Sequence, residues 1–371
     1  MPAAIPVPKI VRELTKEFYL KGFKLYLVGG SVRDYLMGVK SKDYDLATDA
    51  SPEQVIDVLN HTSYTFKSVG KAFGVIIASD NTQDVEIATF REDIGIGRRP
   101  DSVKFSTIDI DVMRRDLTIN ALFYDIQRRE IVDYVGGVSD IKNRIVRTVG
   151  DAEQRFNEDR LRVLRAVRFA ARFGTELDPK TYDAIASNPT LEGVSSERIF
   201  DEFARSVSSA HSVTHYLDML TRLGLLRYVF PNLTLGRMRI ESKNLAMITA
   251  LLLSSNPRSI IVNALLRLKW PSSIVRDIKF LMELHTLTPA TVFQTWNAKQ
   301  RVGLSPDEIM MFATVEPACR TNPCIPVFLN SYAPITLGST LIKEGLTGKK
   351  IGLEIIRRES QLFSNLLMRS V

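Results

Sequence analysis

The sequence predicts an α+β protein, with a mixed β-sheet and flanking helices in the N-terminal part and only helices after it. The sheet is predicted from short apolar runs of strand length at residues 25–28, 64–67, 74–78 and 85–90. An amphipathic pattern at Pro8–Lys21 predicts a helix before the first strand. Ser51-Pro52-Glu53 predicts another helix, with Ser51 as its cap and Pro52 at its first position, and the chain beyond Thr175 has the composition of successive helices.

Length and composition exclude several classes of protein. The 371 residues can form two or three domains with a sizeable core. No run of about 18 uncharged apolar residues occurs, so no transmembrane helix is expected. The N-terminus has neither a signal-peptide nor a transit-peptide pattern, and two cysteines, Cys319 and Cys324, suit a reducing compartment. We therefore expect a cytoplasmic protein without a zinc site.

The positive charge is unevenly distributed. Residues 1–150 contain 21 Lys and Arg against 21 Asp and Glu, whereas residues 151–371 contain 28 against 21. The net charge of +7 therefore belongs entirely to the second part. Such a distribution suits a polyanion held by the C-terminal part while chemistry takes place in the N-terminal part.

The segment around two consecutive glycines predicts a phosphate site. An apolar strand, Leu25–Val28, leads into Gly29-Gly30 and then into a helix that Ser31 is expected to cap. Backbone N–H groups and the positive end of the helix dipole meet at such a corner. A phosphate is the natural ligand there, with Gly30 in the turn and Arg33 adding a bidentate contact.

Acidic residues shortly after this corner predict a metal site. Asp43 and Asp45 alternate along an expected strand, so their carboxylates should lie side by side. Two adjacent anions call for a cation, and Mg²⁺ is usual beside phosphates. Glu86, between two apolar residues on a later strand, is either a third carboxylate of this site or a solvent-facing residue on an edge strand.

Residues 158–173 are rich in helix formers and contain no helix breaker before Gly174, which predicts one helix. One face of it carries a row of arginines at positions 162, 165, 168 and 172, with Asp159 at its border. An ordinary solvated helix face usually mixes charges. Four arginines together repel one another, so we expect an anion, either a nucleotide or RNA, to face them.

Three segments together resemble one family. GGSVRD at residues 29–34, KDYDLAT at 42–48 and RRDLTINA at 114–121 are similar to motifs of the class II tRNA nucleotidyltransferases and bacterial poly(A) polymerases, within the polymerase-β superfamily. The resemblance implies a polymerase-β-like nucleotidyltransferase head. It also implies that Arg115 contacts the triphosphate and Asp116 the ribose hydroxyls. The loop at residues 91–104 corresponds to a flexible loop of the family, although residues 94–97 lack the aromatic and acidic residues usual there.

The same resemblance assigns base selection to Asp159 and Arg162, with Arg165 and Arg168 supporting them. A carboxylate accepts hydrogen bonds and a guanidinium donates them. Cytosine and adenine each present an amino donor beside ring acceptors, which suits this pair. Uracil and guanine would place a carbonyl oxygen against the carboxylate, at a cost of about 1–3 kcal/mol or more.

The sequence thus predicts a template-independent enzyme that adds CCA to tRNA 3′ ends from CTP and ATP, using two Mg²⁺ ions and releasing pyrophosphate. The expected organisation is a catalytic head, a base-selecting neck, a helical body and a tRNA-binding helical tail, at residues 1–150, 151–210, 211–290 and 291–371. Alternatives within this class are a CC-adding enzyme, an A-adding enzyme and a poly(A) polymerase. An alternative from another class is a non-catalytic tRNA-binding protein.

Overall fold

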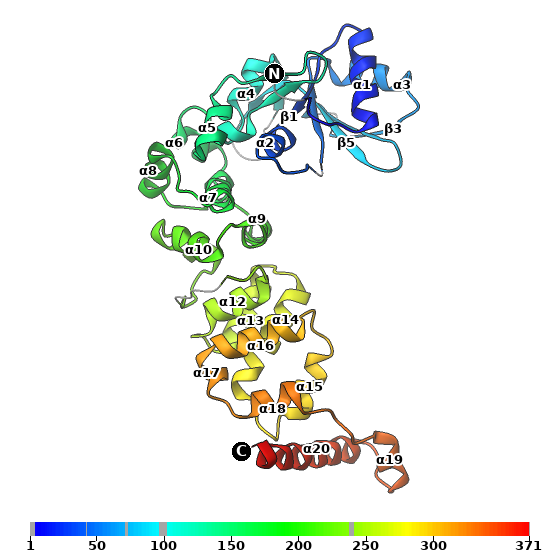
Figure 1. Cartoon of the computed structure of the whole chain (residues 1–371), viewed down its shortest axis with the longest axis vertical. Helices are drawn as coiled ribbons and strands as arrows, with labels where there is room; N and C mark the ends of the chain where they lie inside the picture. The colour runs from blue at the N-terminus through cyan, green and yellow to red at the C-terminus, as the bar shows by residue number, and fades with distance from the viewer. Residues whose placement is uncertain (1–3, 42, 71–72, 96–101, 237–240, 371) are drawn as a thin grey trace. The chain divides into compact units, whose positions relative to one another are not determined.

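The computed structural model describes residues 4–41, 43–70, 73–95, 102–236 and 241–370. The chain divides into two compact units, which Figure 1 presents with their element labels. The N-terminal unit comprises Met1–Val194 and Ala210–Leu225, and the C-terminal unit comprises Ser195–Ser209 and Leu226–Val371. The predicted α+β class is confirmed, because a mixed sheet in the first unit is followed by helices.

The N-terminal unit is built on a sheet of seven strands within the described residues, in the order β3-β4-β5-β2-β1-β8-β9. Strands β2 and β5 pair in parallel and the other neighbours are antiparallel. The strands of this sheet are β1 (Leu25–Val28), β2 (Asp45–Thr48), β3 (Thr65–Gly70), β4 (Val75–Ser79), β5 (Asp84–Thr89), β8 (Phe123–Asp125) and β9 (Glu130–Val132). A separate hairpin consists of β6 (Arg91–Ile94) and β7 (Ser102–Phe105).

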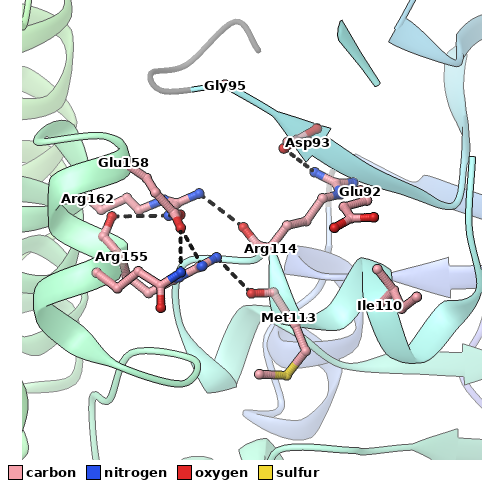
Figure 2. A pocket seen from close by; sticks show the side chains of 10 residues that line it. Glu92, Asp93, Gly95, Ile110, Met113, Arg114, Arg155, Glu158 and Arg162 are labelled. Carbon is pink, nitrogen blue, oxygen red and sulfur yellow. Dashed lines mark hydrogen bonds and ion pairs between the residues drawn. The ribbon is translucent and has the colours of Figure 1, made fainter. Parts of the chain in front are cut away.

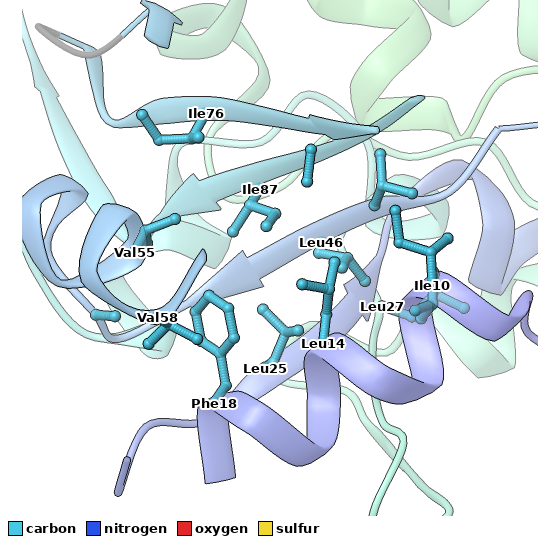
Figure 3. Packing of buried hydrophobic residues seen from close by; sticks show 14 of the residues in the cluster. Ile10, Leu14, Phe18, Leu25, Leu27, Leu46, Val55, Val58, Ile76 and Ile87 are labelled. Atoms are coloured by element: carbon cyan, nitrogen blue, oxygen red, sulfur yellow. The ribbon is translucent and has the colours of Figure 1, made fainter. Parts of the chain in front are cut away.

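The sheet is covered on both faces, which explains why β1 is apolar at every position. Its alternate side chains enter different clusters: Leu25 and Leu27 enter one, and Tyr26 and Val28 enter the other. Figure 3 shows the first cluster, in which an apolar stripe of helix α1 packs on the sheet together with residues of α3. A two-faced core fixes the position of the strand ends, where the polar residues of interest lie.

The helices of the N-terminal unit pack around this sheet and continue beyond it. They are α1 (Lys9–Leu20), α2 (Gly30–Leu36), α3 (Pro52–Asn60), α4 (Ile108–Met113), the 3-10 helix η2 (Thr118–Asn120), α5 (Gly137–Asn143), α6 (Ala152–Glu158), α7 (Leu161–Phe173), α8 (Pro179–Ser187) and α10 (Val213–Arg222). The start of α3 shows the expected local chemistry, since Ser51 and Gln54 form a capping box and Pro52 occupies the first helical position.

The C-terminal unit is helical throughout its described residues. Its helices are α9 (Ser196–Ser209), α11 (Leu226–Val229), α12 (Leu245–Leu253), α13 (Arg258–Arg267), α14 (Ser272–Glu283), η3 (Leu284–Thr286), α15 (Val292–Lys299), α16 (Pro306–Val315), α17 (Pro317–Arg320), α18 (Cys324–Asn330), α19 (Gly338–Lys343) and α20 (Lys349–Ser370). None of the described helices combines the length and apolar character needed to cross a membrane.

A buried carboxylate anchors the end of this unit. Glu359 of α20 is fully buried and accepts hydrogen bonds from the Tyr332 hydroxyl (2.9 Å) and from the backbone N–H groups of Ile335 (3.1 Å) and Thr336 (2.6 Å). Three donors from the segment before α19 therefore converge on one side chain. The segment is held to α20 by these bonds.

Glu359→Ala is expected to destabilise the protein by about 2–5 kcal/mol, because it leaves the buried Tyr332 hydroxyl and two partly buried backbone N–H groups without their acceptor and opens a cavity. Chemical denaturation would measure the loss. The exposed Gln361 on the same helix provides the control, since Gln361→Ala removes no buried contact. Equal effects of the two substitutions would show that Glu359 is not an anchor.

Candidate nucleotide-binding site

Two guanidinium groups converge on the glycine corner between β1 and α2. Gly29 has φ +65°, a conformation that favours glycine. A Cβ placed on Gly29 would lie 3.5 Å from Nη1 of Arg115, and one on Gly30 would lie 3.5 Å from Nη2 of Arg33. The corner thus combines an open backbone with two cations from different elements, which suits an anion such as phosphate.

The cap of α2 differs from the prediction. Gly29 is the N-cap residue, and no side chain among the described residues caps this helix. The prediction that Ser31 caps it is wrong, because the Ser31 hydroxyl donates to the carbonyl oxygen of Val28 (3.1 Å). The helix therefore begins at Gly30, two residues earlier than a Ser31 cap requires.

Arg33 is held tightly beside this corner. Its side chain is buried, donates to Asp34 through Nε (3.0 Å) and Nη2 (2.7 Å), and donates through Nη1 to Asn120. Its guanidinium also lies 4.7 Å from the centre of the Phe169 ring. These contacts orient Arg33 within the protein, and its predicted phosphate contact stays a prediction.

The RRDLTINA segment contains Arg115 and Asp116, and each of them pairs with a side chain of the opposite charge. Arg115 donates to the buried carboxylate of Asp111 and stacks over the Phe123 ring at 4.6 Å. Asp116 accepts from Nε of Arg165 (2.6 Å). Burial opposes ionisation of Asp116, but Arg165 and further donors outweigh it and lower its pKa to about 2. Asp116 is therefore a fixed anion, and its predicted ribose contact stays a prediction.

Three carboxylates, from Asp43, Asp45 and Glu86, lie near the N-terminal end of β2. Asp45 is the first residue of that strand and lies in register with Glu86 on parallel β5, so their side chains face the same way. Asp43 precedes the strand, which corrects the expectation that both aspartates lie within it. The edge-strand interpretation of Glu86 is wrong as well, because β5 lies between β4 and β2.

Uncompensated negative charge marks this cluster. The side chains of Asp43, Asp45 and Glu86 are exposed to solvent. Nearby protein still reduces the hydration of Asp45, and this desolvation, followed by the charge of Asp43, raises the pKa of Asp45, whereas Arg115 opposes the rise. Desolvation and then Asp45 raise the pKa of Glu86, and Arg91 opposes that rise. The charged forms of Asp45 and Glu86 are thus each disfavoured by a neighbouring carboxylate.

A hard cation fits these residues by chemistry. Carboxylate oxygens are the ligands that Mg²⁺ prefers, and a divalent charge would offset the mutual repulsion. Within the described part of the chain, however, no group of three or more His, Cys, Asp or Glu side chains is close enough together to hold a metal ion. The predicted metal site therefore stays a proposal that rests on donor type and charge.

The raised pKa of Asp45 has a measurable consequence. Between its ordinary and its raised pKa the folded state holds more protons than the unfolded state, so this carboxylate lowers folding stability as pH rises through that range. Asp45→Asn is therefore expected to raise the melting temperature at pH 7 in EDTA, and added Mg²⁺ should stabilise the wild type more than the variant. A lower melting temperature in EDTA would contradict the cluster, and Asp57→Asn on α3 is the control.

The predicted row of arginines at positions 162, 165, 168 and 172 has partners within the chain. This corrects the expectation that these arginines need a nucleotide or RNA to balance their charge. Carboxylates pair with three of them: Glu158 with Arg162, Asp116 with Arg165 and Asp34 with Arg172. The fourth guanidinium, from residue 168, lies over the Phe169 ring at 4.4 Å. The row of arginines by itself is therefore no evidence for a nucleic-acid-binding surface.

The predicted single helix is interrupted at Asp159. Helix α6 ends at Glu158 and α7 begins at Leu161, while Asp159 between them is extended and its side chain accepts from the N–H of Leu161 (3.1 Å). The interruption places Asp159 at a corner and Arg162 in the first turn of α7. Structure thus brings both predicted base-selecting residues to one end of a helix.

Arg162 lines a pocket of about 250 Å³, whereas Asp159 does not. In Figure 2, Arg162 donates to Glu158 (2.6 Å) and to the carbonyl oxygen of Arg114 (3.0 Å), and Arg155 also contacts Glu158. The pocket lies among β6, α4, α6 and α7, and its lining residues are Glu92, Asp93, Gly95, Ile110, Met113, Arg114, Gln154, Arg155, Glu158 and Arg162.

Part of the predicted flexible loop is a hairpin. Arg91–Ile94 and Ser102–Phe105 pair as β6 and β7, so these residues form two strands where a flexible loop was expected. Residues 96–101 include Arg98-Arg99-Pro100-Asp101, which is similar to the end of the family's loop pattern, and they lie outside the described residues.

Two family models match parts of the chain. A family model described as the poly(A) polymerase head domain matches residues 25–147, and one described as a probable RNA- and SrmB-binding site of polymerase A matches residues 174–235. In these two segments the chain is similar to the class II tRNA nucleotidyltransferases and bacterial poly(A) polymerases.

Both branches of this family include relatives of the chain. It is 42% identical over 200 residues to the CCA-adding enzyme of Bacillus licheniformis, covering 53% of this chain and 48% of that protein. It is 34% identical over 227 residues to poly(A) polymerase I of Escherichia coli, covering 57% and 48%. The chain thus spans about half the length of the curated relatives it matches.

The fold agrees along nearly the whole chain with that of a family member. The crystal structure of Bacillus stearothermophilus CCA-adding enzyme in complex with CTP superposes with a TM-score of 0.72 at 26% identity, covering 96% of each chain. The GGSVRD and RRDLTINA segments meet at the glycine corner, where Arg33 contacts Asn120 and Arg115 lies beside Gly29. Asp111, Arg114 and Glu158 were missed, although i, i+4 spacings to Arg115 and Arg162 offered a signal for two of them.

Proposed function

We propose that this chain is a template-independent tRNA nucleotidyltransferase that adds C and A from CTP and ATP to tRNA 3′ ends and releases pyrophosphate. The observation that carries the proposal is the juxtaposition of a donor-rich corner, Gly29-Gly30 with Arg115, and the carboxylate of Asp45, whose pKa Arg115 influences directly. Donors for phosphate beside acceptors for a divalent cation are what phosphoryl transfer requires.

The residues divide the work as follows. Gly30, Arg33 and Arg115 hold the triphosphate, with Asp116 directed to the ribose. Asp43 and Asp45, with Glu86 beside them, would hold two Mg²⁺ ions. Bound there, the ions supply activation of the RNA 3′-hydroxyl and stabilisation of the charge on the leaving pyrophosphate. In-line attack on the α-phosphate then extends the RNA by one nucleotide.

Base selection falls to the start of α7. Asp159 and Arg162 read the exocyclic amino group and ring acceptors of cytosine or adenine, and Arg165 and Arg168 support them. Selection by side chains rather than by a template strand follows from this placement. The pocket of about 250 Å³ supports it, because Arg162 is one of its lining residues.

The tRNA would be bound mainly beyond the catalytic head. The excess of basic residues in residues 151–371 supports this, as do the RNA-binding family match and the proposed helical neck, body and tail at residues 151–210, 211–290 and 291–371. We place the protein in the cytoplasm, in keeping with its two free, buried cysteines.

One relative favours a second candidate, a poly(A) polymerase, because the chain is 34% identical to poly(A) polymerase I of Escherichia coli. The decisive experiment incubates tRNAs ending before, within and after the CC sequence with labelled CTP or ATP. We expect CTP addition to the first two and ATP addition once CC is complete. Restriction to CTP alone or to ATP alone would identify a CC-adding or A-adding enzyme. ATP addition to unrelated RNA would identify a poly(A) polymerase, and tRNA binding without incorporation a non-catalytic protein.

A further inference from the structure

Asp111 of α4 is a buried carboxylate shared by two arginines. Its side chain is 1% exposed. One oxygen, Oδ1, accepts from Nε of Arg114 (2.9 Å) and from the backbone N–H of Arg91 (3.3 Å). The other, Oδ2, accepts from Nε (3.2 Å) and Nη2 (3.0 Å) of Arg115. A single side chain thus connects the hairpin strand β6, the pocket-lining Arg114 and the arginine at the glycine corner.

The bidentate contact determines which edge of Arg115 is exposed to a ligand. With Nε and Nη2 directed to Asp111, Nη1 points to the carbonyl oxygen of Asn120 (3.3 Å) and lies beside Gly29. The ring of Phe123 supports one face of the guanidinium. Three contacts of different kinds therefore fix the group, and Asp111 is the only charged partner among them.

Asp111 also separates two like charges. Arg114 and Arg115 are adjacent in the chain. Burial, and after it the charge of Arg114, lower the pKa of Arg115, while the charge of Asp111 opposes this shift. Burial opposes ionisation of Asp111, but the two arginines outweigh it and hold its pKa below the ordinary range. Without this anion, the two guanidinium groups would repel each other and Arg115 would lose its orientation.

We propose that Asp111 is a positioning residue for nucleotide binding, which presents Nη1 of Arg115 to the phosphates of a nucleoside triphosphate at the Gly29-Gly30 corner. The inference rests on the proposed function. Asp111 itself touches no substrate and acts through Arg115. Its effect should therefore depend on the phosphates of the ligand and not on the base.

The test compares CTP and CMP binding, by calorimetry, to the full chain and to Asp111→Asn. The amide keeps the volume of the side chain and loses its charge, so we expect the Kd for CTP to rise about tenfold and that for CMP to change less than about twofold.

Asp140→Asn is the matched control. Asp140 is also buried and accepts from Thr118 (2.6 Å) and Arg147 (2.6 Å). Among the described residues it forms no hydrogen bond or ion pair with Arg115 or with Gly29-Gly30, so its variant should bind both ligands as the wild type does.

A double-mutant cycle separates positioning from general damage. In an Arg115→Ala background, Asp111→Asn should change the Kd for CTP less than about twofold, because its route of action is gone. An unchanged Kd for CTP in Asp111→Asn, or an equal loss for CTP and CMP, would overturn the inference while wild-type incorporation stands. A wild-type protein that binds neither CTP nor ATP would overturn the proposed function, and this inference with it.

Discussion

Asp43→Ala is expected to abolish incorporation of both C and A, lowering kcat by about three orders of magnitude or more, while tRNA binding stays nearly unchanged. The reason is electrostatic. The charge of Asp43 raises the pKa of Asp45, and a divalent cation bound to both would offset their repulsion. Removing it takes away one of two proposed metal ligands and leaves the basic C-terminal part intact. Single-turnover incorporation and a tRNA gel shift measure the two quantities.

The matched control for this substitution is Asp57→Ala. Asp57 is an exposed residue of helix α3 that forms an ion pair with Lys21 (3.3 Å). It is not one of the three carboxylates near the start of β2. Its loss should leave incorporation within about twofold of wild type, as is usual for an exposed pair. Incorporation by Asp43→Ala at a rate near that of the control would show that this carboxylate is not part of the catalytic machinery.

Arg162→Ala is expected to weaken the choice of base. The guanidinium donates hydrogen bonds that match the acceptor atoms of cytosine and adenine. Truncation to alanine leaves these acceptor atoms without a donor from the protein. We expect the preference for CTP over UTP, as a ratio of kcat/KM values, to fall about tenfold or more. Competition assays with mixed nucleotides on one tRNA would measure the ratio directly.

Arg147→Ala is the control for base selection, because Arg147 pairs with Asp140 (2.6 Å) and lines no part of the pocket at Arg162. The variant should keep the wild-type nucleotide preference. If Arg162→Ala slowed all four nucleotides equally without changing their ratio, Arg162 would be a structural residue of the α6–α7 corner and not a base-reading one.

Strand β1 shows what could be predicted from sequence. Four consecutive apolar residues, followed by two glycines, indicated a strand and a tight corner, and the structure has both. The same reasoning indicated the capped start of α3. In these segments the local residues alone decide the conformation, because their periodicity and turn chemistry point the same way.

One feature that could not be predicted depends on a local hydrogen bond that competes with a helix, and the others depend on residues far apart in the chain. Every residue from 158 to 173 is compatible with a helix, yet the side chain of Asp159 interrupts it with a hydrogen bond to Leu161. Arg162 reaches the carbonyl oxygen of Arg114, 48 residues earlier, and Arg165 reaches Asp116. Such pairings follow from the fold of the N-terminal unit and leave no periodic signal in the sequence.

The central claim is that Asp43 and Asp45 hold divalent cations against a triphosphate that lies at the glycine corner. Anomalous diffraction from crystals grown with CTP and Mn²⁺ tests it most directly. We predict Mn²⁺ peaks at about 2.2 Å from oxygens of Asp43 and Asp45, with the phosphates beside Gly30 and Arg115. Bound CTP whose phosphates lie elsewhere, with both aspartates in solvent and without metal, would contradict the claim.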